Sequence, residues 1–305
     1  MPKYYVCLEL GGTHLRLGIV DEQMNVIRFE RQPTRGLSEA ADKVAYLVAL
    51  LRPLVESVGH EQVIGISLAL ASLMDRERSM VYSSPMVSGF DNLPLRDSLA
   101  TALALPVVME KDVNILLLYE MHKQALPMEG IVAGVFVGTG LGNAMCIDGR
   151  VYAGFSGAAC ELGHIPVPGL AEPCGCGKLG CIERKASGHL LADLAAQLYC
   201  PVGEIFQRHG QDARVMDVVH HFALAIATEI TIVDPACILL GGGVLAMPGF
   251  PLESMLQQVR DNVRTPYPRT TLRFAHASGD SEAGVIGAAL HAKRVWAAAG
   301  EAAVQ

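Results

Sequence analysis

Residues 4–27 read YYVCLELGGTHLRLGIVDEQMNVI, and residues 131–152 read IVAGVFVGTGLGNAMCIDGRVY. In each stretch an apolar run is interrupted by a glycine-rich turn and resumes, and a second turn leads into a further apolar run. This pattern predicts two strands around a glycine turn, followed by a third strand. Two such hairpins far apart in one chain indicate a duplicated unit.

Composition favours a folded protein with a sizeable core. The chain has 305 residues, of which 51% are hydrophobic and 18% are charged. That length suits two domains, and that balance argues against disorder. The formal net charge is −7, and the sequence contains no run of Lys or Arg. We therefore expect neither nucleic acid nor an anionic membrane as a partner.

The sequence also indicates a cytoplasmic protein. The first apolar stretch, residues 4–8, is too short for a secretory signal and is cut by Glu9. Residues 130–147 carry no charge and are long enough to span a bilayer, but their glycines, with Thr139 and Asn143, fit a buried hairpin better. Five scattered cysteines in apolar sequence are typical of core residues in a reducing compartment.

Apolar residues at helical or alternating spacing divide the rest of the chain into helices and strands. Helices are predicted at residues 38–58, 94–105, 115–123, 188–198, 215–233 and 281–299. Strands are predicted at residues 63–68, 106–109 and 236–240. This alternation predicts an α/β fold with two lobes and a central cleft as the default active site. We place the smaller lobe at residues 1–115, joined by the C-terminal helix at about 285–305, and the larger lobe at 116–284.

Three glycine clusters each follow an apolar strand. They are Gly11-Gly12, the segment 138–142 and Gly241-Gly242-Gly243. Such turns aim backbone N–H groups at one point, where they can hold the oxygens of a polyphosphate. A tight hairpin explains any one cluster equally well, whereas three together favour a nucleotide. None matches a Walker-type or dinucleotide-binding signature.

A second constellation predicts a metal centre. His164 precedes a glycine-rich loop that carries Cys174, Cys176 and Cys181. Three thiolates and one imidazole are a ligand set that zinc accepts in tetrahedral geometry. Cysteines packed in a core are the alternative, but so many glycines do not make a core. Because four protein ligands leave no open position, the predicted zinc is structural.

Carboxylates near this loop and at the end of a strand are candidates for chemistry. The strand predicted at 106–109 runs into Lys111 and Asp112, where a helix begins. A helix N-cap alone would explain an aspartate there. However, open α/β sheets place ligands at the carboxyl ends of strands, and Glu161 and Glu183 bracket the zinc loop. Carboxylates and an imidazole can accept hydrogen bonds from the hydroxyls of a neutral polyol.

In this order, the motifs resemble the ROK family of sugar kinases and sugar-responsive repressors, whose fold is the duplicated actin-like/hexokinase ATPase. The resemblance runs from Glu9 to Gly287, and the zinc loop is its most specific part. Closer likeness to D-allose kinases rests on residues 111–114, Asp234-Pro235, residues 241–244 and Met247-Pro248. It implies ATP-dependent phosphorylation of D-allose to D-allose 6-phosphate. The alternatives are a glucokinase, an N-acetylmannosamine kinase, or a sugar-sensing regulator without kinase activity.

The resemblance also implies roles for individual residues. Asp112 would be the catalytic base that takes the proton of the sugar 6-hydroxyl as this oxygen attacks the γ-phosphate. Contacts with the sugar are implied for Lys111, Asp112, Glu161, His164 and Glu183. Zinc ligation is implied for His164, Cys174, Cys176 and Cys181. ATP and Mg²⁺ are expected at Glu9, Gly11, Gly12, Thr13, Gly138, Thr139, Gly140, Gly241, Gly242 and Gly243.

Some positions depart from the family pattern. Glu9 replaces an aspartate, which changes how Mg²⁺ is held, and Lys111 and Met86 each replace an asparagine. A strand that begins by Tyr4 leaves no room for the helix-turn-helix of the family's repressors. The zinc loop disfavours a non-sugar ATPase such as an acetate kinase or filament protein. We expect a homodimer, since this is the commonest symmetric assembly.

Overall fold

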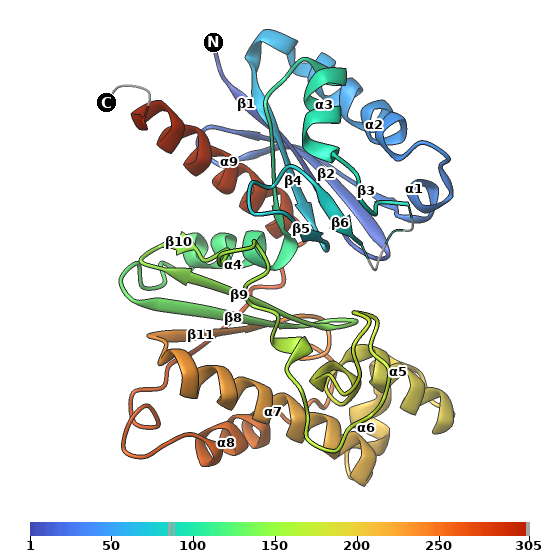
Figure 1. Ribbon diagram of the computed structural model, residues 1–305, viewed down its shortest axis with the longest axis vertical. Helices are drawn as coiled ribbons and strands as arrows, with labels where there is room; N and C mark the ends of the chain where they lie inside the picture. Colours follow the sequence, from blue (N-terminus) through green and yellow to red (C-terminus); the bar gives the residue numbers. More distant parts are fainter. Residues whose placement is uncertain (85–86, 88, 303–305) are drawn as a thin grey trace. The chain divides into compact units, whose positions relative to one another are not determined.

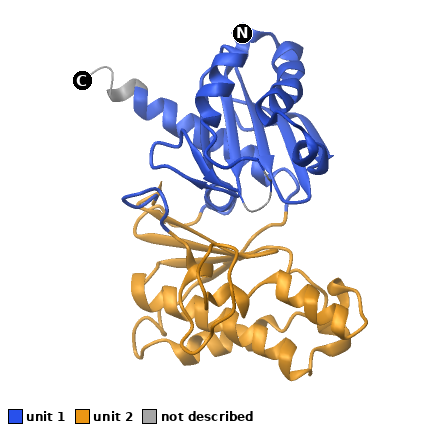
Figure 2. Ribbon diagram, turned by 45° about the vertical axis from the view of Figure 1, so that its right-hand side comes forward, with its two compact units in different colours: residues 1–125, 153–159, 280–305 blue, residues 126–152, 160–279 orange. Residues whose placement is uncertain are grey.

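The computed structural model describes residues 1–84, 87 and 89–302, so the expectation for Met86 falls outside the described residues. It divides into two compact units. Unit 1 comprises residues 1–125, 153–159 and 280–305, and unit 2 comprises residues 126–152 and 160–279 (Figure 2). The chain therefore enters unit 2 twice, because the short segment 153–159 packs with unit 1.

Unit 1 is built on a five-stranded sheet in the order β3-β2-β1-β4-β7. Its strands are β1 (Tyr4–Leu10), β2 (His14–Asp21), β3 (Val26–Pro33), β4 (Val63–Leu70) and β7 (Val107–Lys111). The first three form an antiparallel meander, whereas β1, β4 and β7 run parallel. A two-stranded ribbon of β5 (Leu73–Met74) and β6 (Val81–Ser83) lies apart from this sheet.

Unit 2 repeats the arrangement, with strand order β10-β9-β8-β11-β12. Its strands are β8 (Ile131–Val137), β9 (Leu141–Ile147), β10 (Arg150–Val151), β11 (Cys237–Gly241) and β12 (Phe274–His276). Again the first three strands form an antiparallel meander, whereas β8, β11 and β12 run parallel. The duplicated unit predicted from the two glycine-turned hairpins is thus confirmed, and the uncharged segment 130–147 is the β8–β9 hairpin.

Helices cover both faces of the unit 1 sheet (Figure 1). They are α1 (Arg35–Glu39), α2 (Lys43–Val58), α3 (Leu95–Leu103), α4 (Asp112–Lys123) and α9 (Ala283–Ala302). Along β1, alternate side chains point to opposite faces, as strand geometry requires. Val6, Leu8 and Leu10 pack in the core with α2 and α3, whereas Tyr5 and Cys7 pack with α9.

The helices of unit 2 gather on its sheet around α7 (Figure 1). They are α5 (Gly188–Gln197), α6 (Ile205–His209), α7 (Ala213–Val233) and α8 (Leu252–Asn262). Among the described residues, α7 is the one helix long and apolar enough to cross a membrane. More than half of its most apolar window is buried, and its Phe222, Ile226 and Ile230 are fully buried against the sheet, as in a core helix.

The predicted helices differ from the observed ones by a few residues at their ends, and two of these differences involve an aspartate at the helix start. The helix predicted at 38–58 is divided into α1 and α2, because the Asp42 side chain accepts a hydrogen bond from the backbone N–H of Ala45 and so caps a new helix. The helix predicted at 115–123 begins three residues earlier, at Asp112 itself. Asp112 is therefore the first helical residue, directly after the buried strand β7.

Candidate active site and metal centre

The first glycine turn joins β1 to β2 in unit 1. Gly11 N–H donates to the His14 carbonyl at 3.0 Å, which closes the turn. From behind, the Thr34 hydroxyl donates to the Gly11 carbonyl at 2.7 Å, and the Thr34 N–H donates to the Thr13 carbonyl at 3.0 Å. Gly12 and Thr13 are exposed at the tip. Because two carbonyls are fixed from behind, the turn presents a defined backbone surface to solvent.

Glu9 lies on β1 one residue before its end and is only 9% exposed. It lies opposite Arg16 in the hairpin register, and its Oε1 accepts from Arg16 Nη1 at 2.9 Å. On its other side the carboxylate packs against Gly284 at the start of α9, where any Cβ would collide with it. Burial raises the pKa of Glu9, Asp112 adds to this rise by repulsion, and Arg16 opposes it. Glu9 and Asp112 are thus electrostatic neighbours within unit 1.

Asp112 and Lys111 form the corner between β7 and α4. The Asp112 carboxylate accepts from the Val113 N–H at 2.9 Å, as an acid in the first turn of a helix does. Lys111 Nζ donates to the carbonyl of Ala159 at 3.3 Å. Both side chains are partly exposed. The structure therefore brings Glu9, Asp112 and the first glycine turn together in unit 1.

The second glycine turn, residues 138–140, joins β8 to β9 in unit 2. Its carbonyls accept hydrogen bonds from the first N–H groups of α5: Gly188 donates to Gly138 at 3.0 Å and His189 donates to Thr139 at 2.9 Å. A Cβ at Gly188 would lie 2.2 Å from the Gly138 carbonyl oxygen, so this approach requires glycine. Thr139 is exposed at the tip.

Glu183 lies against the same turn rather than projecting freely. Its Oε2 accepts from the Leu141 N–H at 3.0 Å, and the carboxylate touches the position where a Cβ of Gly140 would stand. The 3₁₀ turn that carries it, Ile182–Arg184, follows directly after Cys181. Glu183 therefore connects the cysteine loop with the second glycine turn.

The third glycine cluster, at the end of β11, also adjoins the β8 hairpin. Gly242 has a φ of +99°, and a Cβ there would lie 2.3 Å from the Val137 carbonyl oxygen. The Val244 N–H donates to that carbonyl at 3.0 Å. Gly242 and Gly243 are exposed. Two of the three predicted phosphate turns, residues 138–140 and 241–243, are thus neighbours in unit 2.

The four predicted zinc ligands converge in unit 2. One ligand atom from each of His164, Cys174, Cys176 and Cys181 lies within 4.8 Å of all the others. Cys176 Sγ is 3.6 Å from Cys181 Sγ, and Cys174 Sγ is 3.6 Å from His164 Nδ1. A tetrahedral zinc with bonds of about 2.0–2.3 Å has ligand–ligand edges of roughly 3.5–3.8 Å. The donor atoms therefore fit zinc in both number and spacing.

The protonation chemistry of the thiols points the same way. Burial, reinforced by the neighbouring Cys176 and Cys174, raises the pKa of Cys181 to about 12. A thiol in that environment ionises at neutral pH when a bound cation stabilises the thiolate. Three cysteines held this close, with 1% of Cys181 and 7% of Cys174 exposed, are accordingly a metal ligand set rather than ordinary core residues.

His164 uses its two nitrogens differently. Its Nδ1 faces Cys174 Sγ, and its Nε2 lies 3.7 Å from Glu161 Oε2. Metal-bound histidines commonly direct the other ring nitrogen at a carboxylate, which orients the ring. The Lys178 ammonium also donates to the His164 carbonyl at 2.9 Å. Within unit 2, Glu161 is therefore linked to the cysteine loop through His164, and Glu183 follows the loop directly in the chain.

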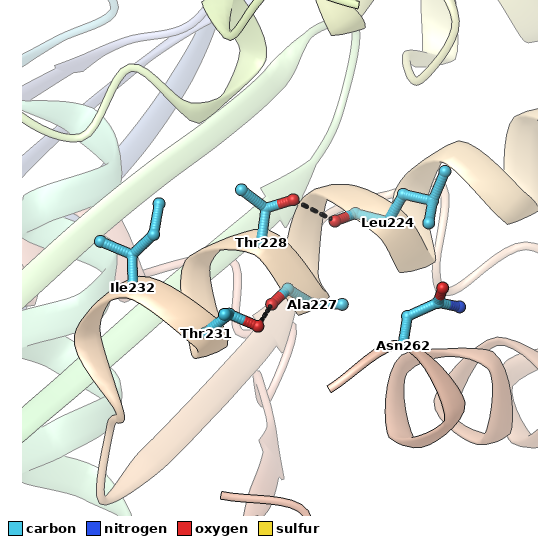
Figure 3. A pocket seen from close by; sticks show the side chains of 6 residues that line it. All are labelled: Leu224, Ala227, Thr228, Thr231, Ile232 and Asn262. Carbon is cyan, nitrogen blue, oxygen red and sulfur yellow. Dashed lines mark hydrogen bonds between the residues drawn. The ribbon is translucent and has the colours of Figure 1, made fainter. Parts of the chain in front are cut away.

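A shallow pocket of about 230 Å³ on α7 contains none of the predicted site residues. Figure 3 shows its lining by Leu224, Ala227, Thr228, Thr231, Ile232 and Asn262. Both threonine hydroxyls donate at 2.7 Å to carbonyls one turn earlier in α7, at Leu224 and Ala227. Those hydroxyl protons are therefore already donated inside the helix.

Known proteins share these features. The model of the protein family described as "ROK family" matches residues 5–295 of this chain. This chain belongs to the ROK family. It is 28% identical to a glucokinase of Halalkalibacterium halodurans, with 93% of each chain covered. It is 30% identical to an N-acetyl-D-glucosamine kinase of Pectobacterium atrosepticum, over 79% of this chain and 84% of that one.

Among solved structures, a ROK family glucokinase from Streptomyces griseus, in complex with glucose and AMPPNP, has a TM-score of 0.76 to this chain. The two are 25% identical, and the match covers 93% of this chain and 97% of that one. The ROK chain thus has the two-lobed, duplicated actin-like fold that the sequence predicted. Its His164 and cysteine set is the zinc motif expected of that family.

Three residues that support this ROK site, Arg16, Thr34 and Gly188, belong to none of the motifs in the sequence. Arg16 could have been found, because a turn of residues 11–14 pairs position 9 with position 16 across the hairpin. Thr34 and Gly188 could not, since their contacts with the two turns join residues 23 and 50 positions apart. Nothing local in the sequence marks such partners.

Proposed function

We propose that this chain transfers the γ-phosphoryl group of ATP to the 6-hydroxyl of a hexose. It is a sugar kinase of the ROK family. The proposal rests mainly on the family match over residues 5–295. Within that match, both units carry glycine turns, and the carboxylate of Asp112 lies at the end of β7. Phosphoryl transfer needs mainly alignment and charge stabilisation, which such parts provide.

In unit 1, Asp112 is the proposed base. It accepts the proton of the sugar 6-hydroxyl while that oxygen bonds to the γ-phosphorus and the bond to the ADP oxygen breaks. The turn at Gly11, Gly12 and Thr13 binds phosphate oxygens through its N–H groups. Glu9, which is held beside Asp112, offers a carboxylate for Mg²⁺, and that ion would supply positive charge to the phosphates.

In unit 2, the turns at Gly138–Gly140 and Gly241–Gly243 bind the nucleotide. Glu161 and Glu183 accept hydrogen bonds from sugar hydroxyls, the His164 ring nitrogen that does not bind zinc donates to a sugar hydroxyl, and Lys111 of unit 1 donates to the sugar. His164, Cys174, Cys176 and Cys181 would hold zinc, whose bonds would tie the histidine rigidly to the cysteine loop. We further propose that the lobes predicted at residues 1–115 with 285–305 and at residues 116–284 correspond to units 1 and 2, and that the active protein is a cytoplasmic homodimer.

The choice of sugars to test is guided by the names of the relatives. Those described above are named as kinases of glucose and of N-acetyl-D-glucosamine. We therefore propose glucose or an N-acetylhexosamine as the first substrates to test, ahead of the D-allose suggested by the motif likeness. A hydroxyl-binding site that matches one hexose rejects an epimer because a buried polar group is then left unpaired.

A coupled assay for ADP tests this proposal. The purified protein is incubated with ATP, Mg²⁺ and, in turn, glucose, N-acetylglucosamine, N-acetylmannosamine and D-allose. We expect one hexose to stimulate ADP formation strongly. Asp112→Asn should lower kcat by about 10²- to 10⁴-fold, because the variant keeps the shape of the side chain and removes the base. Asp97→Asn, at an acid in the first turn of α3, is the matched control and should leave kcat unchanged.

Two results would contradict the proposal. Turnover undiminished in Asp112→Asn would remove the base from the mechanism. ATP hydrolysis that proceeds equally without any sugar would make the protein an ATPase rather than a sugar kinase.

A further inference from the structure

The segment 153–159, here called the strap, is bound to unit 1 by three basic side chains. Its alternate carbonyls, at residues 155, 157 and 159, each accept one hydrogen bond. The donors are Arg76 Nη1 at 3.4 Å, Arg78 Nη1 at 3.0 Å and Lys111 Nζ at 3.3 Å. The strap is thus held by its backbone, and the residues that follow it lead directly into Glu161 and His164.

Arg78 is the most constrained of these donors. It is 8% exposed and has a φ of +52°, in the left-handed region. Besides the Gly157 carbonyl, its Nη1 reaches the Asp75 carbonyl at 3.0 Å. A Cβ at Gly157 would lie 2.9 Å from that same Nη1, and Gly157 itself has a φ of +85°, so the strap needs glycine where Arg78 binds it.

The charge of Arg78 is matched by Glu110, the residue two positions before Asp112. Arg78 Nη2 lies 2.9 Å from Glu110 Oε1, and Glu110 is 4% exposed. The same oxygen accepts from the Lys111 N–H at 2.8 Å and from Asn114 Nδ2 at 2.9 Å. One carboxylate oxygen therefore accepts hydrogen bonds from the end of β7 and from the first turn of α4, and it forms an ion pair with the guanidinium that holds the strap.

We propose that Arg78 and Glu110 are positioning residues that hold Asp112 and the strap as a single rigid corner. The assignment of a catalytic consequence rests on the proposed kinase function. Asp112 lies between Lys111 and Asn114, and both of these are bonded to Glu110. Loss of either partner leaves the other charge buried without its counter-ion, and the corner then rearranges to solvate it.

The expected consequence is a loss of alignment. Displacement of a catalytic group by about 1 Å, caused by a change that touches no substrate, can lower turnover about 100-fold. Glu110→Gln and Arg78→Gln should therefore each lower kcat by about 10- to 100-fold, with KM for ATP changed by less than about threefold. The kcat of Asp112→Asn is the reference for complete loss of the base, and the kcat values of Glu110→Gln and Arg78→Gln are compared with it.

The chain offers a matched control for each variant. Glu120 is 2% exposed and lies on α4, two turns beyond the corner. Arg52 lies on α2 and donates to the Ala102 carbonyl at 2.8 Å, so it holds neither the strap nor the corner. Glu120→Gln and Arg52→Gln should leave kcat within about twofold of the unchanged protein.

A double variant separates positioning from stability. Arg78→Met with Glu110→Leu removes both buried charges at once, and such replacements often restore or raise stability. We expect the thermal midpoint of the double variant to recover above that of either single variant, while kcat stays low. Recovery of kcat together with the midpoint would overturn the proposal, because the pair would then serve folding alone.

Hydrogen exchange provides a readout that is independent of activity. In Arg78→Gln, backbone amides of residues 111–114 and of the strap should exchange faster together, with α2 unchanged. If no hexose is phosphorylated by the unchanged protein, the kinase function fails, while coupled exchange still supports the rigid corner. Faster exchange in the strap alone, with residues 111–114 unaffected, would overturn the coupling.

Discussion

The two glycine turns occupy equivalent places in the two sheets, yet they are supported differently. In unit 1, the turn after β1 is held from behind by Thr34, a single side chain at the end of β3. In unit 2, the turn after β8 is held by the N-terminus of α5 and by Glu183, which follows the cysteine loop. The same hairpin is thus fixed by the hydroxyl and the N–H of one threonine in unit 1, and by a helix N-terminus and a glutamate next to the cysteine loop in unit 2.

This difference indicates how duplicated units diverge in function. The unit 1 turn lies next to Glu9, a carboxylate paired with Arg16 and repelled by Asp112, so its surroundings are suited to charge and proton chemistry. The unit 2 turn lies beside a second glycine cluster and the predicted zinc centre, so its surroundings are suited to holding ligands. The two units therefore share one sheet topology, while the residues around their glycine turns differ in charge and in the ligands that they can bind.

Removal of the metal should produce the largest contrast between the two turns. Cys181→Ser, or treatment with a zinc chelator, should lower the free energy of unfolding by about 3 kcal/mol or more, since structural zinc binding contributes directly to folding. Hydrogen exchange should rise at residues 138–141 and 162–184 and stay unchanged at residues 10–15. Cys200→Ser, at a cysteine outside the cluster, is the control. Equal loss of protection at both turns would remove the distinction.

Glycine replacement tests the helix contact of the unit 2 turn. Gly188→Ala should cost about 3 kcal/mol, because its Cβ would overlap the Gly138 carbonyl oxygen at 2.2 Å. Gly11→Ala in the unit 1 turn places its Cβ 3.0 Å from the His14 carbonyl oxygen and should cost about 1 kcal/mol. Chemical denaturation measures both values. The reverse order would mean that α5 does not define the turn.

Buried carboxylates give a contrast in pH dependence. Glu229 lies in the core of unit 2, where Asn143 Nδ2 donates to its Oε1 at 2.8 Å and its Oε2 has no hydrogen-bond partner in the described part of the chain. Burial raises the pKa of Glu229 to about 7. The folded state holds this proton more tightly than the unfolded state does. The contribution of Glu229 to the free energy of unfolding is therefore largest at low pH and falls as pH rises from about 4.5 to 7.

Glu229→Gln cannot ionise and should escape that fall. Between pH 5 and pH 8, the variant should lose about 2 kcal/mol less unfolding free energy than the unchanged protein. Glu253→Gln, at an exposed position on α8, is the control and should follow the unchanged protein. Parallel pH profiles for the unchanged protein and Glu229→Gln would show that Glu229 is solvated or paired in solution.

The smallest effect is expected at the support of the unit 1 turn. Thr34→Val keeps the volume of a side chain that is 1% exposed and removes the hydrogen bond to the Gly11 carbonyl. It should cost about 1 kcal/mol and speed amide exchange at residues 10–15 without affecting residues 138–141. Thr101→Val, on an exposed face of α3, controls for the loss of a hydroxyl. An effect on both turns would mean that they are not independently supported.

The sequence alone determined the features that are encoded locally. Alternating apolar residues and glycines predict each hairpin, and the repetition of that pattern predicts the duplicated unit. Close spacing of Cys174, Cys176 and Cys181 after His164 predicts the ligand set that converges in unit 2. The position of Asp112 at the end of a strand also follows from residues next to it. Each hairpin, the ligand set and the position of Asp112 are encoded by residues close together in the chain, and the duplication is recognised by comparing two such local patterns.

Tertiary structure decided the contacts that join distant segments. Arg78 and the Gly157 carbonyl are 79 positions apart, and the assignment of the strap to unit 1 rests on such contacts. The same is true of the link from Glu183 to Leu141, which are 42 positions apart. A buried charge or an unpaired carbonyl must find a partner, but packing selects which one, since many polar residues in the chain could serve. That choice arises when the sheets and helices assemble.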